Sequence, residues 1–406
     1  MNEAAEIIDD RGGIGLPLHD NTLRSVTILG STGSIGCNTI DLLERHRESF
    51  TVEALTANNN IKLLAEQARK IGAKSAVTAD HSRYRELKCE LADTNINVSA
   101  GPEALAEAAD MPAEFVMAGI VGAAGLRPTL AAVKRGAIVG LANKECLVCA
   151  GDLMIGEVER NCATLLPVDS EHNAIYQVFD FEREASVARI ILTASGGPFR
   201  NADLTTMTNA TPEQAVAHPN WDMGAKISVD SATMMNKGLE MIEAFHLFPV
   251  TAEKIDILVH PQSVIHSMVE YVDGSVLAQL GTPDMRTPIA YSLAWPERIA
   301  TPSAKLDLAE LATLTFEAPD PERFPCLRLA QEALATGGAA PIILNAANEI
   351  AVAAFLKRKI QFMDIPRLVE FCLLKVGVGE VNSIEAVMEI DGEARKIALE
   401  NIDSRK

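Results

Sequence analysis

Long uninterrupted apolar stretches are missing from this sequence, which argues against a membrane-spanning helix. The longest charge-free runs, residues 115–126 and 333–348, are too short or too often broken by glycine, proline and asparagine to cross a bilayer. The first twenty residues contain five acidic side chains and no apolar core, so they do not have the pattern of a secretory signal. We therefore expect a soluble, cytoplasmic protein with no membrane partner.

Basic blocks and aromatic residues are also scarce. Only 4% of the 406 residues are aromatic, and 55 acidic residues outnumber 36 lysines and arginines, which gives a formal net charge of −19. Nucleic acid is therefore not an expected partner. The seven cysteines are odd in number and scattered, so they do not suggest a disulfide framework. Cys146 and Cys149 have the C-x-x-C spacing of redox proteins, but this pair stands alone and we expect a structural role.

A dinucleotide-binding pattern begins at Ser25. Residues 25–29 are expected to form a strand and residues from Asn38 onward a helix, with the turn Gly30-Ser-Thr-Gly-Ser-Ile-Gly36 between them. Glycines let the backbone approach a pyrophosphate, and the helix N-terminus supplies amide donors. A P-loop is the rival interpretation, but its Gly-Lys-Ser/Thr ending is missing.

The second expected strand, residues 52–57, ends in Asn58-Asn59-Asn60 and not in an acidic residue. NAD-binding folds usually place a carboxylate there to bind the ribose hydroxyls, and a carboxylate would repel a 2′-phosphate. The uncharged ending therefore favours NADP over NAD, and these three asparagines are candidate cofactor residues. The preference is modest, because the triplet itself contains no arginine or lysine.

Further strands and helices alternate along the first 172 residues. Strands are expected at 74–78, 114–120, 137–142 and 163–168, and helices at 61–71 and 127–134. This alternation predicts a parallel, doubly wound, Rossmann-like sheet, in which ligands bind beyond the carboxyl ends of the strands. Two strands end in dense polar clusters: Asn143-Lys144-Glu145 and Asp169-Ser170-Glu171-His172. An ordinary polar loop is the alternative, but two clusters at this edge favour a binding site.

Asp169 and Glu171 are two residues apart, so both carboxylates project to the same side while the chain stays extended. Two carboxylates within about 4 Å repel each other by roughly 4 kcal/mol at an effective dielectric near 20, and something must offset this. A shared proton would serve, but oxygen ligands of this kind suit Mg²⁺ or Mn²⁺. His172 is a further possible ligand, although a histidine beside carboxylates is more often a hydrogen-bonding core residue.

A second polar group lies in residues 218–240. If a helix starts at Asp230 and Ser231, which are good N-cap types, then Asn236, Lys237 and Glu240 share one face. A solvated helix face is the alternative interpretation. The helix carries too many apolar residues for a free surface helix, however, so its polar face is expected to line a cavity.

The remaining chain predicts three further regions. A strand over residues 189–194 runs into Ser195-Gly196-Gly197, whose amides could bind an anion, and Asp273-Gly274 joins two strands in a hairpin. The loop with Met285 could approach a cofactor. The expected division of the chain is a lead-in (1–24), an NADPH-binding domain (25–172), a central α+β catalytic and dimerisation domain with an antiparallel sheet (173–295), a linker (296–325) and a C-terminal helical bundle (326–406).

Several long motifs resemble one enzyme family. They include residues 29–36, 142–145, 166–174, 195–199, 218–221, 226–240, 260–266 and 281–288, in the order of 1-deoxy-D-xylulose 5-phosphate reductoisomerase. The resemblance runs from about Val26 to the C-terminus. It implies NADPH- and metal-dependent rearrangement and reduction of 1-deoxy-D-xylulose 5-phosphate to 2-C-methyl-D-erythritol 4-phosphate, in the non-mevalonate route to isoprenoids, by a homodimer.

The same resemblance implies roles for individual residues. Cofactor contacts would come from Thr32, Gly33, Ser34, Ile35, Asn143, Glu145, Gly224 and Met285. Metal ligands would be Asp169, Glu171 and Glu240, and Trp221 would lie in a mobile lid. Substrate contacts would come from Lys144, Ser170, Glu171, Ser195, His218, Ser231, Asn236, Lys237 and Glu240, with Lys144, Glu171 and His218 as catalytic candidates.

The chain departs from the family pattern at Asn58-Asn59, where the family often has glycine and lysine, and this weakens the expected preference for NADPH. Two other functions remain open at this stage. Another NADP-dependent sugar-phosphate or homoserine-type dehydrogenase would turn over without a divalent metal. A non-catalytic NADP sensor would bind nucleotide without turnover.

Overall fold

The computed structural model describes residues 23–404 except residues 222 and 378. Most of the expected lead-in (1–24) falls outside this range, but Arg24 already belongs to the first strand. Its buried guanidinium pairs with Glu114 at 2.9 Å and donates to the backbone oxygens of Leu293 and Trp295, each at 2.9 Å. The first strand therefore starts one residue earlier than the sequence pattern predicts.

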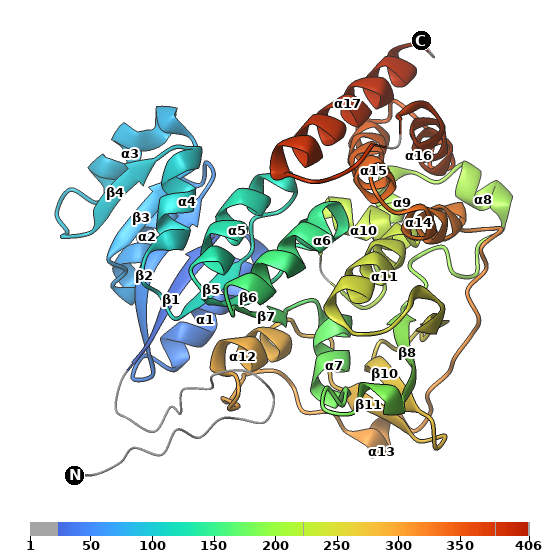
Figure 1. The fold of residues 1–406 in the computed structure, drawn as a ribbon, viewed down its shortest axis with the longest axis horizontal. Helices are drawn as coiled ribbons and strands as arrows, with labels where there is room; N and C mark the ends of the chain where they lie inside the picture. Colours follow the sequence, from blue (N-terminus) through green and yellow to red (C-terminus); the bar gives the residue numbers. More distant parts are fainter. Residues whose placement is uncertain (1–22, 222, 378, 405–406) are drawn as a thin grey trace.

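Seven parallel strands form the first sheet, in the order β4-β3-β2-β1-β5-β6-β7 (Figure 1). They are β1 (Arg24–Leu29), β2 (Phe50–Ala57), β3 (Ser75–Thr78), β4 (Asn97–Ala100), β5 (Phe115–Ala118), β6 (Ile138–Leu141) and β7 (Thr164–Pro167). The predicted Rossmann-like sheet is confirmed. Only β4 was missed, because it is a short, half-exposed edge strand without an apolar run. The order turns between β1 and β5, where such folds open a ligand crevice.

Seven α-helices follow these strands, with the predicted helix at 61–71 matching α2 at both ends. They are α1 (Ser34–Arg45), α2 (Ile61–Ile71), α3 (Tyr84–Glu90), α4 (Pro102–Asp110), α5 (Leu126–Lys134), α6 (Glu145–Arg160) and α7 (Ser170–Val178). Local chemistry sets the ends of α2: the Asn60 side chain accepts from the Leu63 amide, and Gly72 ends the helix with φ +67°.

Four strands form the second sheet, in the order β11-β10-β8-β9. They are β8 (Val187–Ala194), β9 (Ile255–Val259), β10 (Ile265–Tyr271) and β11 (Val276–Leu280). The predicted hairpin is confirmed, since β10 and β11 are antiparallel and Gly274 adopts φ +84° between them. The predicted antiparallel sheet is present as β11-β10-β8, since β10 is also antiparallel to β8, and β9 extends it by pairing with β8 in parallel, which makes the whole sheet mixed. Several helices separate β8 from β9, and this long connection allows a parallel return.

The polar stretch 218–240 forms two helices instead of the single predicted helix. α10 (Ala225–Ala232) ends just before Met234, whose left-handed φ of +59° turns the chain, and α11 (Met235–Leu247) follows. Asp230 and Ser231 therefore lie in the last turn of α10, and the prediction that they start the helix is wrong. The short helices α8 (Leu204–Thr208) and α9 (Pro212–Val216) precede this pair.

The predicted C-terminal helical bundle is confirmed and packs against α11. It contains α14 (Pro325–Thr336), α15 (Ala340–Leu356), α16 (Asp364–Lys375) and α17 (Ile384–Asp403). Gly238 of α11 lies so close to Ala330 of α14 that a Cβ would collide with the Ala330 methyl group. The helix with the predicted polar face is therefore enclosed between the bundle and the rest of the fold (Figure 1).

Helix α12 (Arg286–Ala294) was not predicted from the sequence. It follows the loop with Met285 and returns to the first sheet, where Ile289 and Leu293 share a core with Val26. The expected linker contains the short helix α13 (Leu308–Leu311) and touches the second sheet through a bridge between Val259 and Glu317. The domain boundaries within the chain stay a prediction.

The cysteines fit the structural role that the sequence predicts for them. All seven cysteines are free thiols, and Cys146 and Cys149 are buried, with burial raising the pKa of Cys146 to about 12. Such a thiol is a poor nucleophile, which fits a structural role. No described helix has the length and apolar content needed to cross a membrane.

Candidate active site

A cavity of about 440 Å³ lies where the first sheet meets α10 and α11. It brings together most of the residues that the sequence identified as candidates. Those lining it are Ser34, Ile35, Lys144, Glu145, Asp169, Ser170, Glu171, Ser195, His218, Trp221, Gly224, Ser231, Asn236, Lys237, Glu240 and Met285. Segments more than 250 residues apart in the chain therefore share one site.

Three carboxylates form the floor of this cavity. Asp169, Glu171 and Glu240 each offer an oxygen, and these oxygens lie within 4.8 Å of one another. The predicted pair after β7 is present, but the assumed extended chain is wrong: Asp169 caps α7, and its carboxylate accepts from the Glu171 amide at 3.3 Å. Convergent carboxylate oxygens are what Mg²⁺ prefers, so the donor set fits a divalent cation.

Two lysines lie against these carboxylates. Lys144 Nζ is 3.1 Å from Asp169 Oδ2, 3.5 Å from Glu240 Oε1 and 2.7 Å from Asn236 Oδ1. Lys237 Nζ is 2.9 Å from Glu171 Oε1 and also pairs with Glu240. The predicted shared face of α11 is confirmed, because Asn236 and Lys237 both contact Glu240. The two lysines offset two of the three carboxylate charges, and His172 adds a third positive charge that is matched by a fourth carboxylate, Glu243. The group therefore keeps one net negative charge, which attracts a cation.

Burial makes the carboxylates of this cluster unequal. Desolvation, with repulsion from Asp169 and Glu171, raises the pKa of Glu240 to about 7 against the opposing lysines. Asp169 is also desolvated, but the positive charges of Lys144, His172 and Lys237 lower its pKa well below the ordinary value. A cation beside Glu240 would therefore favour its charged form, which burial otherwise opposes.

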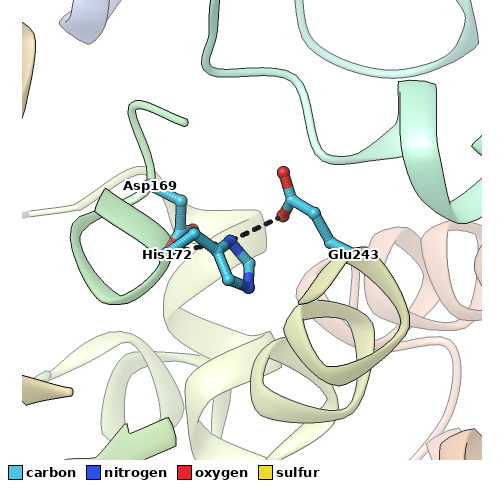
Figure 2. Close-up of side chains that lie close together, drawn as sticks. All are labelled: Asp169, His172 and Glu243. Carbon is cyan, nitrogen blue, oxygen red and sulfur yellow. Dashed lines mark ion pairs between the residues drawn. The ribbon is translucent and has the colours of Figure 1, made fainter. Parts of the chain in front are cut away.

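His172 is a fully buried partner of the cluster (Figure 2). Its Nδ1 lies 3.2 Å from Glu243 and 3.7 Å from Asp169, and its Nε2 hydrogen-bonds the backbone oxygen of Glu240 at 2.8 Å. Burial opposes its charge, but Glu243, Asp169 and Glu240 raise the pKa of the ring to about 9. The alternative that His172 is a core residue holding hydrogen bonds fits this geometry better than metal ligation.

Ser195 and His218 form a polar corner of the cavity. His218 Nδ1 accepts from the Trp221 amide at 3.0 Å, so its Nε2 carries the proton and donates to Ser195 Oγ at 2.8 Å. The Gly197 amide also donates to Ser195 Oγ, at 3.1 Å. Desolvation lowers the pKa of His218, which keeps the ring neutral. The Ser195 hydroxyl proton is left to donate into the cavity.

The glycine turn borders one side of the cavity. Gly30 has φ +84°, and a Cβ on Gly36 would fall on the backbone of Gly30 and Ser31, so α1 can pack against the turn only with glycine there. Ser34 and Ile35, which begin α1, line the cavity, whereas Thr32 and Gly33 lie beside it in the turn. This close backbone approach fits a dinucleotide pyrophosphate.

Two of the predicted cofactor contacts play different parts in this region. The side chain of Asn143 is buried and donates to the backbone oxygens of Ile120 and Gly122, at 2.5 and 3.0 Å, so it shapes the neighbouring loop. Glu145 lines the cavity and lies 3.5 Å from Lys226.

The asparagine triplet lies outside the cavity, at the adjoining edge of the sheet. The Asn60 side chain caps α2, and the Asn58 backbone oxygen accepts from the Thr78 hydroxyl at 2.6 Å. The triplet contains no basic residue, but Arg83 Nη2 donates to the Asn59 backbone oxygen at 3.3 Å. Tertiary structure brings this cation to the triplet.

Sequence reasoning missed two groups that line the cavity. His266 of β10 lies near Trp221, with the two ring centroids 6.2 Å apart. Lys226 pairs with Asp230 at 2.9 Å, and Asp230 accepts from Asn348 of α15 at 2.7 Å. The i, i+4 spacing of Lys226 and Asp230 is the sequence signal for this pair. It was not recognised because the helix was expected to start at Asp230, and α10 starts at Ala225.

Comparisons with known proteins agree with this architecture. Three family models match in succession: 1-deoxy-D-xylulose 5-phosphate reductoisomerase over residues 26–151, its C-terminal domain over 165–248, and a DXP reductoisomerase C-terminal domain over 280–397. The 1-deoxy-D-xylulose 5-phosphate reductoisomerase of Rhodospirillum centenum is 62% identical over 380 residues, covering 94% of each chain. That of Zymomonas mobilis is 59% identical, covering 92% of this chain and 96% of its own.

Solved structures give the same result. The Zymomonas mobilis enzyme in complex with NADPH superposes with a TM-score of 0.89 at 56% identity, covering 94% of this chain and 98% of that one. A DOX-P reductoisomerase in complex with NADPH, fosmidomycin and magnesium superposes with a TM-score of 0.90 at 45% identity and the same coverage.

Proposed function

Since this chain belongs to the 1-deoxy-D-xylulose 5-phosphate reductoisomerase family, we propose that it converts 1-deoxy-D-xylulose 5-phosphate into 2-C-methyl-D-erythritol 4-phosphate. It is an NADPH-dependent oxidoreductase that uses magnesium and serves the non-mevalonate route to isoprenoid precursors. The observation that carries this function is the convergence of Asp169, Glu171 and Glu240 in a cavity that the glycine turn also lines. A metal site next to a nucleotide turn is what a coupled rearrangement and reduction needs.

Asp169, Glu171 and Glu240 would hold the divalent cation, with Mg²⁺ as the expected ion and Mn²⁺ as an alternative. When bound, such an ion polarises a carbonyl and lowers the pKa of a coordinated hydroxyl, and NADPH supplies the hydride that reduces the rearranged aldehyde. The protein's own contribution is to fix the three carboxylates. Capping of α7 orients Asp169, and contacts from Lys237 orient the other two.

The substrate phosphate is proposed to bind at the corner formed by Ser195, Ser231, Asn236 and Lys237. Supporting this, Ser195 has a free hydroxyl proton and Lys237 brings a buried positive charge. The overall charge of −19 does not oppose this binding, because surface charges are screened beyond about 8 Å at physiological salt. Phosphate binding at this remote handle would draw the Trp221 lid over the substrate and exclude water.

Lys144, Glu171 and His218 are proposed as the catalytic residues. Lys144 contacts Asp169, Asn236 and Glu240, so its ammonium can donate a hydrogen bond to an oxygen that gains charge in the rearrangement. The Ser170 hydroxyl donates to Glu171 at 2.5 Å and so holds that carboxylate in place while offering a substrate contact. His218 positions the Ser195 hydroxyl through its Nε2.

The cofactor is proposed to lie along the glycine turn and the sheet edge. Thr32, Gly33, Ser34 and Ile35 would bind the pyrophosphate at the start of α1, and Asn58, Asn59 and Asn60 would flank the adenosine end. Glu145, Gly224 and Met285 line the cavity and would border the nicotinamide end, with Asn143 shaping the loop beside it.

We further propose a homodimer formed through β11. This strand is the edge of the second sheet, and Val276, Leu277 and Leu280 on it are 48%, 49% and 37% exposed. An exposed apolar edge strand favours pairing with another strand, and a second copy offers the matching edge. The free thiols among the described residues fit a reducing compartment, which supports the proposed cytoplasmic location.

The test mixes the protein with NADPH and 1-deoxy-D-xylulose 5-phosphate, with magnesium or with a chelator, and follows NADPH absorbance. We expect oxidation only when the metal is present, and the product can be identified by mass spectrometry. Glu240→Gln should abolish turnover. The matched control is Glu159→Gln, which removes an exposed carboxylate on α6 and should leave the rate unchanged.

Two outcomes would contradict the proposal. Turnover that persists in chelator would indicate an ordinary NADP-dependent dehydrogenase. Binding of NADPH without any turnover, unaffected by Glu240→Gln, would indicate a nucleotide sensor.

A further inference from the structure

The carboxyl ends of β2 and β3 lie side by side at the edge of the first sheet (Figure 1). Ala57 pairs with Thr78, and the Ala79 amide donates to the Ala57 backbone oxygen at 2.8 Å. The turn after β3, including the short 3₁₀ helix His81–Arg83, therefore lies against the asparagine triplet that follows β2. In folds of this kind the end of the second strand is where the adenosine ribose binds.

Arg83 projects its guanidinium to this place. Its Nη2 donates to the Asn59 backbone oxygen at 3.3 Å and to Glu86 Oε1 at 3.2 Å, and its Nε lies 3.0 Å from Glu86 Oε2. The side chain is 39% exposed, so solvent and ligands can reach it. A guanidinium next to the ribose position is the group best suited to a phosphate, because its planar fork donates two parallel hydrogen bonds.

The surrounding charges permit this contact. The triplet itself has no acidic residue, and the carboxylate of Asp80 is already engaged, accepting from the Ser82 amide at 2.8 Å. Glu86 is the direct competitor for Arg83, but an exposed pair of this kind contributes little to stability. A phosphate with nearly two negative charges would therefore displace it.

We propose that Arg83 recognises the 2′-phosphate of NADPH and so determines the preference of this enzyme for NADPH over NADH. The inference builds on the proposed function, since it assigns a residue to the cofactor that the reaction uses. Arg83 takes the place of the lysine that the resemblance leads one to expect at Asn58-Asn59. The cation comes from the neighbouring strand's turn and not from the triplet.

Isothermal titration calorimetry of NADP⁺ and NAD⁺ tests this without turnover. In Arg83→Gln the affinity for NADP⁺ should fall about tenfold or more, because a hydrogen-bonded charge contact is lost, while the affinity for NAD⁺ stays within about twofold. The affinity of Arg83→Gln for adenosine 2′,5′-bisphosphate should fall in the same way, whereas its affinity for 5′-AMP should not change. The matched control is Arg85→Gln, which removes an exposed arginine two residues away and should change neither affinity.

The inference is overturned if the ratio of NADP⁺ affinity to NAD⁺ affinity in Arg83→Gln stays at the wild-type value, whether both affinities fall equally or neither changes. Unchanged NAD⁺ binding shows that the variant is folded. If the wild-type protein oxidises NADPH with the proposed substrate but Arg83→Gln keeps the wild-type ratio, only the assignment of Arg83 fails. If the wild-type protein does not turn over at all, the proposed function fails independently.

Discussion

The glycine turn and the carboxylate cluster border the same cavity but are built differently. The turn comes from one contiguous segment, residues 30–36, and offers mainly backbone amides. The cluster needs side chains from three elements, because Lys144 precedes α6, Asp169 caps α7 and Glu240 lies on α11. The turn therefore depends on local conformation, whereas the cluster depends on long-range packing.

This difference also separates the energetics of the two regions. In the turn, the close contacts are between backbone atoms and a changed side chain creates a steric clash. In the cluster, buried charges stabilise one another, so removing one leaves its partner desolvated and unpaired. Mutations in the two regions should consequently fail in different ways, and the following measurements test that contrast.

Asp169→Asn should have the largest effect and should leave the turn untouched. Removing one of the three proposed metal ligands forfeits several kcal/mol of transition-state stabilisation, which corresponds to about a thousandfold loss in kcat. Steady-state kinetics with saturating magnesium measures this. Calorimetry should show wild-type NADP⁺ affinity. A parallel loss of NADP⁺ binding would mean that the two regions are not separable.

Asp230→Ala should destabilise the protein by about 3 kcal/mol or more, because it leaves Lys226 without its 2.9 Å partner and removes the acceptor of Asn348. Denaturant unfolding gives the free energy. Asp256→Ala is the matched control, since it breaks an exposed pair with Arg189 and should cost less than about 1 kcal/mol. Equal losses in the two variants would contradict the importance of burial.

His172 should make stability depend on pH. Its folded-state pKa of about 9 lies above the ordinary 6.5, so its contribution is present in full below about pH 6.5 and is lost as the pH rises through 9. The full difference corresponds to about 3 kcal/mol. The free energy of unfolding is measured in chelator at pH 6 and at pH 9.5. Its decrease between these two pH values should be larger for the wild type than for His172→Gln. Parallel pH profiles would show that the ring is neutral when folded.

Gly36→Ala should act on the turn alone. The added Cβ falls on backbone that cannot move aside cheaply, and such overpacking costs about 1–3 kcal/mol. We expect NADP⁺ affinity to fall by about tenfold or more, with unchanged dependence of the residual activity on magnesium. Gly156→Ala on α6 is the control, because a Cβ there meets nothing within 4 Å.

Asn60→Ala should have the smallest effect. The Asn60 side chain caps α2, and losing a cap costs about 1 kcal/mol. Thermal unfolding should show this loss, while NADP⁺ affinity should change much less than in Arg83→Gln. A larger change in affinity than in stability would indicate that the side chain leaves the cap to contact the cofactor directly.

Much of the fold could be predicted because its signals are local. The boundaries of α2 follow from a cap residue, an amphipathic pattern and a terminal glycine, and the hairpin follows from Asp273-Gly274. The break at Met234 could not be predicted, because a left-handed methionine has no sequence signal. The parallel pairing of β8 with β9 also has no local sequence signal, because tertiary packing determines which strands pair.

For the site, residue types and their spacing were enough to identify the candidate groups that meet at the cavity: the glycine turn, the acidic pair after β7, and the polar face with Asn236, Lys237 and Glu240. The members of each group are close in the sequence, so they lie close together in the folded protein as well. Only the tertiary structure decided which lysine neutralises which carboxylate, that Asp230 is buried against the C-terminal bundle, and that Arg83 reaches the asparagine triplet. Charges attract across space without regard to chain separation, so these partners become visible only once the chain is folded.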